Sequence, residues 1–268
     1  MNTDKQAVHD FWNAASCGES LYLHGTEVQA YADQAAKRYE LEPYILAFAD
    51  FAAARGRDVL EIGVGLGADH QRFAEAGARL VGVDLTERAV AHTRQRLAAF
   101  GLSSKLQTAD AENLPFESDS FDIVYSWGVL HHSPNTPKAI DEVWRVLRPG
   151  GSARIMVYHT HSMVGYMLWI RYALLAGRPG RTLADIYAAH LESPGTKAYT
   201  PEQARALLGR FSKVEVETVL THGDLLTSDA GQRHRGALLT IAKALWPRRF
   251  IRTFFPRHGL FLLARAIK

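Results

Sequence analysis

The feature that most constrains this chain is a strand pattern, a run of glycines and a helix pattern in immediate succession. Residues 59–62 form a short apolar run with β-branched residues at both ends and one acid, Glu61, inside, which is typical of a buried parallel strand. The glycines that follow are Gly63, Gly65 and Gly67, and a helix pattern runs from 69 to 76. Glycines let the backbone approach a ligand closely, and a helix N-terminus offers unpaired N–H groups. The succession therefore predicts a nucleotide-type site.

The spacing of this motif fits two kinds of ligand. Gly63-x-Gly65-x-x-Ala68 matches the dinucleotide fingerprint, and Asp84 lies about 20 residues further on, where a ribose-binding acid is expected. Glu61 favours S-adenosylmethionine, because an acid two residues before the first glycine suits an ammonium group and repels a pyrophosphate. On this motif alone both ligands remain open.

Composition limits the class of protein. The chain has 268 residues, of which 47% are hydrophobic, which suits one domain with insertions or one domain plus a cap. A formal net charge of +3 is too small to indicate nucleic acid by itself. The polar N-terminus does not read as a signal peptide, and the longest apolar helical stretch, 162–176, is shorter than the ~20 residues that span a bilayer. We therefore expect a cytoplasmic location.

Metal binding is not expected from the sequence. Cys17 is the single cysteine, which excludes an internal disulfide framework and a zinc cluster built on thiolates. Twelve histidines are present, but none forms a ligand pair at metal spacing followed by an acid. His131 and His132 are adjacent, so we expect their rings to point in different directions.

Strand and helix patterns alternate through the middle of the chain. Repeated β-α units imply a parallel sheet with helices on both faces. The expected strands are 59–62, 79–84, 105–108, 121–127, 152–158, 213–219 and 260–267. The expected helices are 7–12, 27–40, 44–54, 69–76, 86–100, 137–147, 161–176, 183–190, 201–208 and 236–246, with a loop at 16–25. We divide the chain into an N-terminal helical cap (1–54), a core (55–158) and a part that holds cap insertions and the remaining core strands (159–268).

Five segments carry a resemblance to a known family. They are Glu61–Gly67, Gly82–Asp84, Ala109–Phe116, Phe121–His132 and Val146–Gly151. In this order they resemble the class I S-adenosylmethionine-dependent methyltransferases, in particular the broad bacterial group with small-molecule and quinone-type substrates. The dinucleotide fingerprint does not call for the last three segments. The resemblance implies a seven-stranded, mostly parallel, doubly wound Rossmann-like sheet whose last strand is antiparallel and lies beside the fifth, with helical cap insertions.

The resemblance also implies how S-adenosylmethionine is held. Glu61 is expected to hold the methionine ammonium, and the three glycines let the loop pass under the ligand. Asp84 is expected to accept both ribose hydroxyls, with Leu85 against the adenine. Asp110 is expected to accept from the adenine amino group, with the Ala111 N–H facing the ring. Ser126 and Trp127 are expected near the sulfonium.

Candidate residues for chemistry and for the acceptor follow the same strand ends. His131, His132 and His159 are candidate general bases, because imidazole titrates near neutral pH; simple packing roles are the alternative for each. The candidate acceptor-binding residues are Cys17, Tyr22, His24, Tyr158 and Tyr166.

The predicted function is methyl transfer from S-adenosylmethionine to a small or hydrophobic acceptor through O, N, S or C, a small thiol included. The alternative is a catalytically silent S-adenosylmethionine-binding partner or sensor. An RNA or protein methyltransferase is disfavoured, because Ser126-Trp-Gly-Val stands where an Asn/Asp-Pro-Pro-Tyr/Phe motif is usual. The basic, aromatic segment 246–257 is either a solvated face or a weak contact with an anionic membrane surface. No nucleic acid partner is expected, and the oligomeric state is open.

Overall fold

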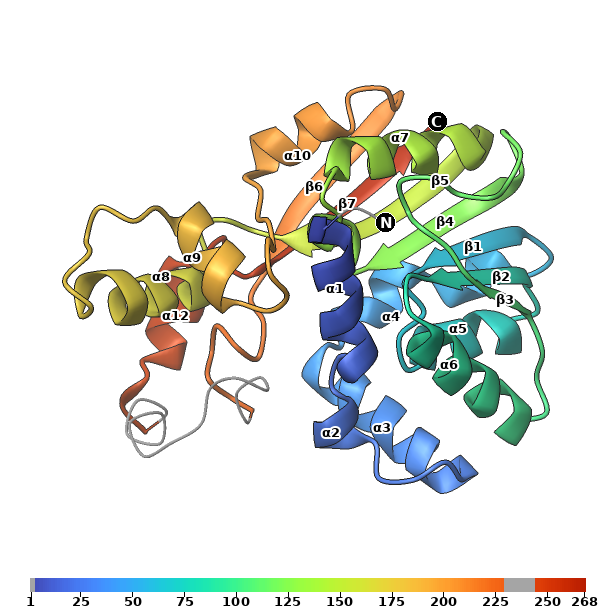
Figure 1. The fold of residues 1–268 in the computed structure, drawn as a ribbon, viewed down its shortest axis with the longest axis horizontal. Helices are drawn as coiled ribbons and strands as arrows, with labels where there is room; N and C mark the ends of the chain where they lie inside the picture. The colour runs from blue at the N-terminus through green and yellow to red at the C-terminus, as the bar shows by residue number, and fades with distance from the viewer. Residues whose placement is uncertain (1–2, 229–243) are drawn as a thin grey trace.

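The computed structural model describes residues 3–228 and 244–268, which contain a seven-stranded sheet with helices on both faces (Figure 1). The strands lie in the order β3-β2-β1-β4-β5-β7-β6. They are β1 (Asp58–Ile62), β2 (Arg79–Asp84), β3 (Lys105–Thr108), β4 (Phe121–Trp127), β5 (Leu147–Tyr158), β6 (Lys213–Val219) and β7 (Phe261–Ile267). Strand β7 pairs antiparallel with both β5 and β6, while β1 to β5 pair parallel. The predicted fold class is confirmed.

The core lies on both faces of this sheet, because successive side chains of a strand point to opposite faces. In β1, Leu60 and Ile62 pack with buried residues of α7 (Thr136–Val146) and α10 (Pro201–Leu207), whereas Val59 packs with α4 (Tyr44–Ala49) and α5 (Ala68–Glu75). Strands β4, β5 and β7 divide their buried residues between the same two clusters. The sheet therefore forms the middle of three layers, with the central strands buried on both sides.

The remaining helices cover the sheet or extend beyond it. They are α1 (Thr3–Ala14), α2 (Glu19–Tyr22), α3 (Val28–Leu41), η1 (Phe51–Ala54), α6 (Glu87–Ala99), η2 (Leu130–His132), α8 (Met163–Trp169), η3 (Ile170–Leu174), α9 (Leu183–His190) and α12 (Arg248–Phe254). Figure 1 shows α1 standing at the end of the sheet, between the core and a separate group formed by α8, α9 and α12. The division at 54 and 158 stays a prediction.

Several expected elements differ from the structure. Helix α1 extends beyond the expected 7–12 at both ends, and β5 begins at Leu147 and not at residue 152. The helix expected over 44–54 stops at Ala49, because Asp50 adopts a left-handed conformation (φ 44°) that ends the helix, and η1 follows. The loop expected over 16–25 contains the short helix α2. The helix expected over 161–176 begins at Met163, because the Ser162 hydroxyl caps it by accepting from the Gly165 N–H. Most of the helix expected over 236–246 lies outside the described residues.

A buried carboxylate joins the last part of the chain to the sheet. Asp224 is fully buried and accepts hydrogen bonds from the Thr221 N–H and hydroxyl, from the Val164 N–H and from the Leu260 N–H. It therefore ties the start of α8 to the residue just before β7. Among residues 3–228 and 244–268, no helix is both long and apolar enough to cross a membrane.

A buried arginine joins the N-terminal helices to the glycine loop. Arg96 of α6 is fully buried and donates to the side chains of Gln71 and Gln34 and to the carbonyls of Leu66 and Tyr31. Its acceptors are neutral, and they belong to α3, to α5 and to the loop before α5. This single side chain fixes three segments that border the ligand site described below.

Replacing Arg96 by methionine should lower the free energy of unfolding by about 3 kcal/mol, because buried carbonyls and amides lose their donors. Urea denaturation followed by circular dichroism measures the change. Arg94→Met is the matched control on the same helix, since Arg94 is exposed and should shift stability by no more than about 0.5 kcal/mol. Equal effects of the two substitutions would contradict this role for Arg96.

Candidate functional site

One pocket lies at the carboxyl ends of the parallel strands and has a cavity volume of about 230 Å³. It is lined by the glycine loop after β1, by the ends of β2 and β4, by the loop after β3 and by Tyr158 at the end of β5. Residues of α1, of the following loop and of α3 close it from the N-terminal side. Of the predicted site residues, it contains Cys17, Glu61, Gly63, Gly65, Gly67, Asp84, Leu85, Asp110, Ala111, Trp127, His132 and Tyr158.

The glycine loop is shaped so that only glycine fits at its first position. Gly63 has φ 86°, and a Cβ there would lie 2.0 Å from Val129 Cγ2. Gly65 also has a positive φ (52°), but a Cβ there would meet nothing within 4 Å. The first glycine thus permits close packing against the segment after β4, and the second leaves open space above the loop.

The acid at the end of β2 is bound to the same loop. Asp84 Oδ2 accepts from the Gly65 N–H at 3.3 Å, and Oδ1 accepts from the N–H and hydroxyl of Thr86. Burial raises the pKa of Asp84, while these hydrogen bonds act in the opposite direction. The carboxylate is therefore fixed in position beneath the pocket.

Glu61 forms a buried pair with a histidine. Its Oε2 is hydrogen-bonded to His70 Nδ1 at 2.8 Å, and His70 Nε2 is bonded to the Ser104 hydroxyl. Burial raises the pKa of Glu61 well above its ordinary value, and burial lowers the pKa of His70 to about 3. Burial thus disfavours the charged form of both groups.

A second buried acid, Asp69, lies at the start of α5. It accepts from the Arg38 guanidinium (2.7 and 3.1 Å) and from the hydroxyls of Tyr39 and Tyr125. Burial opposes ionisation of Asp69, but the positive charge of Arg38 and the hydrogen bonds from Arg38, Tyr125 and Tyr39 together outweigh it, so the pKa of Asp69 is lowered. Arg38 is thereby bound at the edge of the pocket and also lies 3.4 Å from Glu42.

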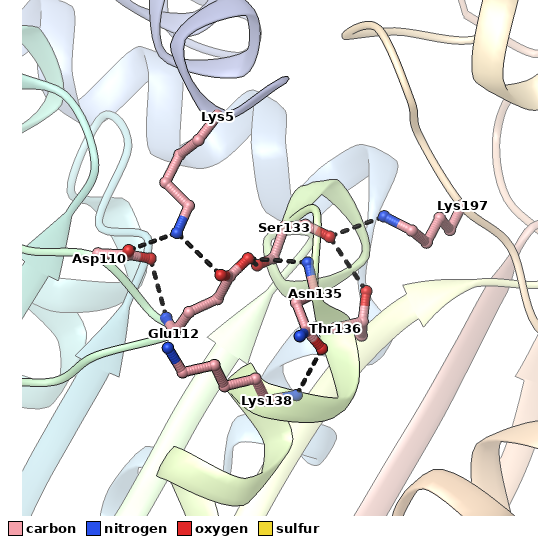
Figure 2. A network of polar contacts seen from close by, with 8 residues as sticks. All are labelled: Lys5, Asp110, Glu112, Ser133, Asn135, Thr136, Lys138 and Lys197. Atoms are coloured by element: carbon pink, nitrogen blue, oxygen red, sulfur yellow. Dashed lines mark hydrogen bonds and ion pairs between the residues drawn. The ribbon is translucent and has the colours of Figure 1, made fainter. Parts of the chain in front are cut away.

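A network of charges fastens α1 over the loop after β3 (Figure 2). Lys5 Nζ donates to Asp110 Oδ2 at 2.5 Å and to Glu112 Oε2 at 2.8 Å. Glu112 also accepts from the Ser133 hydroxyl and the Asn135 N–H, at the start of α7. Asp110 is therefore engaged by Lys5 on one oxygen, and each carboxylate oxygen can accept more than one hydrogen bond.

The three candidate histidines occupy different environments. His132 lines the pocket, and its Nδ1 lies 2.8 Å from the Ser193 hydroxyl and 3.1 Å from the Thr196 hydroxyl. Thr196 uses its own proton on the Ser193 carbonyl, so Nδ1 is the donor to Thr196. Nε2 makes no hydrogen bond and lies 3.3 Å from Glu192 Oε2.

The other two histidines are placed away from the pocket lining. His131 is fully buried beside the rings of His132 and Tyr158, and burial holds its pKa well below the ordinary value. His159 is buried, and its Nδ1–H donates to the Gly259 carbonyl. Neither His131 nor His159 lines the described pocket, and their roles as general bases stay predictions.

The expectation about the adjacent histidine rings is wrong. Both residues belong to the single turn η2, and their ring centres lie only 4.2 Å apart. His131, His132 and Glu192 each offer a ligand atom, and these atoms lie within 4.8 Å of one another. Glu192 lies 60 residues after His132 in the sequence, so metal-ligand spacing within a single motif does not reveal it. The absence of a metal therefore stays a prediction.

Four further candidates also lie off the described pocket lining. Ser126 is fully buried and points to the opposite face of β4 from Trp127, because strand side chains alternate. Tyr22 lies in α2, and His24 is exposed. Tyr166 is hydrogen-bonded to His258 Nδ1 and packs in the cluster around α12.

The basic, aromatic segment 246–257 lies apart from the pocket. Ile251 is its buried anchor, while Phe250 and Phe254 are exposed. Arg249 and Arg252 are exposed on the same helix. This arrangement presents aromatic and positive groups together, and the weak membrane contact stays a prediction.

Several pocket residues were not anticipated. They are Lys5, Trp12, Arg38, Glu42, Asp69, Glu192 and Phe261. Asp69 was open to detection, since it follows the glycine loop directly and a helix N-terminus favours an acid. The others come from segments remote in sequence, where no local pattern marks them.

Comparisons with known proteins agree with the recognised family. Residues 60–155 match a family described as a methyltransferase domain. The chain is 36% identical over 101 residues to a sterol 4-C-methyltransferase of Caenorhabditis elegans, covering 37% of this chain and 30% of that protein. It is 28% identical over 166 residues to a demethylmenaquinone methyltransferase of Tropheryma whipplei, covering 56% of this chain and 68% of that protein. The chain thus spans about a third of the length of the first relative.

The fold recurs in solved structures. A phosphoethanolamine N-methyltransferase of Haemonchus contortus, solved with phosphomonomethylethanolamine and S-adenosylhomocysteine, superposes with a TM-score of 0.57 at 19% identity, covering 84% of this chain and 52% of that one. This likeness shows the fold, while the family match over residues 60–155 confirms the recognition of an S-adenosylmethionine-dependent methyltransferase domain for that part of the chain.

The single cysteine reports on the charge of the pocket. Cys17 lines it and is exposed. The surrounding protein limits hydration of the thiolate, and together with the charges of Glu192 and Glu42 this raises the pKa of the thiol to about 12. The rate of alkylation by iodoacetamide should therefore rise about tenfold per pH unit between pH 8 and 10, without a plateau. Glu192→Gln and Glu42→Gln should each increase the rate at fixed pH, because each removes a repelling charge.

The control is Glu40→Gln on the exposed side of α3, which should leave the alkylation profile unchanged. Since Cys17 is the chain's single cysteine, the labelling site is unambiguous. A plateau near pH 9 in the unmodified protein would contradict the electrostatic account.

Proposed function

We propose that this protein transfers a methyl group from S-adenosylmethionine to a small or hydrophobic acceptor bound in the same pocket. The observation that carries the proposal is the sharing of one cavity by three strand-end groups. The glycine loop, Asp84 and Asp110 line it, and so do Trp127, His132 and Tyr158. A donor and an acceptor therefore have room to meet at the end of β4.

The residues present fit this donor. Open space above Gly65 leaves room for the ligand, and Asp84 is fixed where a carboxylate accepts from a ribose. Asp110, Ala111 and Leu85 form the adenine side, and Glu61 lies beneath the methionine end. When bound, the donor supplies an activated methyl group whose leaving group departs neutral.

The chain's own contribution is alignment and a dry acceptor space. Trp12, Trp127 and Phe261 give the acceptor side of the pocket an aromatic wall. If the acceptor carries a proton, the groups placed to receive it are Glu192 and His132, whose Oε2 and Nε2 lie 3.3 Å apart in the pocket lining. His132 alone of the three candidate histidines lines the described pocket. Ser193 and Thr196 hold its ring in place.

A silent binding protein is the alternative. It would keep the donor side while lacking space or a polar group for an acceptor. The pocket instead continues past Trp127 to His132 and Glu192, which supports turnover.

Titration calorimetry with S-adenosylhomocysteine tests the proposal. We expect micromolar binding to the unmodified chain, and Asp84→Ala should weaken it by ~1.5–3 kcal/mol, about 10- to 100-fold, because charge-assisted hydrogen bonds are lost. Glu87→Ala is the control, since this exposed acid lies three residues further on and outside the pocket. Absence of binding at millimolar ligand, or tighter binding of a nicotinamide dinucleotide, would refute the proposal.

A further inference from the structure

The charges around the pocket point to the kind of acceptor it takes. Among its described lining residues, the basic side chains are Lys5 and Arg38. Lys5 is bound to Asp110 and Glu112 (Figure 2), and Arg38 is bound to Asp69. An anionic acceptor such as a phosphate would therefore meet no uncommitted cation on these walls.

The acids of the pocket are not all matched in the same way. Asp110 is paired with Lys5 and Asp69 with Arg38, while Asp84 accepts from the glycine loop and Glu61 is bound to His70. Two lining carboxyls remain, Glu42 and Glu192.

Glu42 and Glu192 are short of positive charge. Glu42 Oε2 is buried, makes no hydrogen bond and lies 3.4 Å from an Arg38 guanidinium already committed to Asp69. Burial raises the pKa of Glu42 to about 7. The charge of Arg38 acts to lower this pKa, and the charges of Asp69 and Glu192 act to raise it. Glu192 Oε2 accepts from the Tyr158 hydroxyl at 2.6 Å, which is a neutral donor. A cation between the two acids would relieve their repulsion.

The surrounding walls suit an organic cation. Trp12, Trp127 and Tyr158 line this part of the pocket with Phe261, and Trp12 contacts the His132 ring. Aromatic faces attract cations once water is excluded. His132 is also buried with its Nε2 lacking a hydrogen bond, so a polar atom of the lining stands ready for a ligand.

We propose that the acceptor is an organic amine, which enters as its ammonium ion and is held between Glu192 and Glu42 within the aromatic wall of the pocket. This inference rests on the proposed methyl transfer and names its substrate class. The ammonium first gives a proton to the Glu192 carboxylate. The nitrogen lone pair then forms the N–C bond to the methyl carbon while the C–S bond breaks, with its electron pair left on a neutral thioether. The positive charge ends on the methylated nitrogen, and Glu192 later releases its proton to water.

The test measures binding before activity. Calorimetry is performed on the full chain saturated with S-adenosylhomocysteine, using amines and alcohols of matched shape: 2-phenylethylamine against 2-phenylethanol, tryptamine against its alcohol, and cyclohexylamine against cyclohexanol. We expect the amines to bind at least tenfold more tightly than their alcohols. Equal binding of each pair, or no amine binding at about 10 mM, would overturn the inference. Since S-adenosylhomocysteine binding is measured first, its failure would instead refute the proposed function.

Two variants locate the cation. Glu192→Gln and Glu42→Gln should each weaken amine binding about 10- to 100-fold, while alcohol and S-adenosylhomocysteine binding change less than about threefold. Glu40→Gln is the control, because Glu40 is exposed on α3, the helix that ends just before Glu42. It should change none of these affinities. An equal loss of S-adenosylhomocysteine binding in Glu42→Gln would assign that acid to the donor and overturn its part in the site.

A metal is the competing occupant of the Glu192 side. Zinc titration of the unmodified chain and of Glu192→Gln separates the two. Micromolar zinc binding that depends on Glu192 and excludes the amines would overturn the inference. Formation of S-adenosylhomocysteine and N-methylamine after exhaustive chelation, abolished in Glu192→Gln, would support it.

Discussion

The position of β1 decides where this molecule can hold a ligand. It pairs with β2 on one side and with β4 on the other. The strand order therefore runs from β1 through β2 to β3 in one direction and from β4 to β5 in the other. The crevice at such a reversal of strand order lies at the carboxyl ends, where loops rather than strands meet. The tight packing of Gly63 against Val129 depends on this pairing, because it requires the ends of β1 and β4 to lie side by side. The other groups of the pocket line the same crevice as Gly63 and Val129.

Around this crevice the protein distributes charge unevenly. The donor side is built from acids that are individually matched: by Lys5, by Arg38, by backbone N–H groups and by His70. The acceptor side is built from aromatic rings and from Glu42 and Glu192, whose negative charges are less fully paired with positive groups. A pocket with this division distinguishes its two ligands by electrostatics as well as by shape. That distinction could not be made from composition, since the whole chain is slightly basic.

The sequence predicted the sheet well and the walls of the site poorly, for a physical reason. Strand β4 is marked by local hydrophobic runs, and the glycine loop by residues whose conformation few others adopt. These signals are local, so most strands fall close to their expected positions, while β5 begins at Leu147, five residues before the expected start. The error at Asp50 arose because a left-handed residue interrupts a pattern that otherwise reads as one helix. Arg38 and Glu192 reach the pocket only through tertiary packing, and a single sequence carries no trace of such contacts. Ser126 lies off the described pocket lining because side chains alternate along β4, and its place near the sulfonium stays a prediction.

The bridge from Lys5 to Asp110 and Glu112 makes the first helix part of the binding equilibrium. A nucleoside that reaches Asp110 from the side of α1 finds its carboxylate already bound to the ammonium group of Lys5. The nucleoside and Lys5 must therefore share the Asp110 carboxylate, or the nucleoside must displace Lys5. Asp110 is partly exposed, and mobile ions screen such pairs over distances of about 8 Å at physiological ionic strength. The ion pairs that hold α1 against the loop after β3 therefore weaken as the salt concentration rises. The rate at which a nucleoside enters past α1 should rise with salt for the same reason.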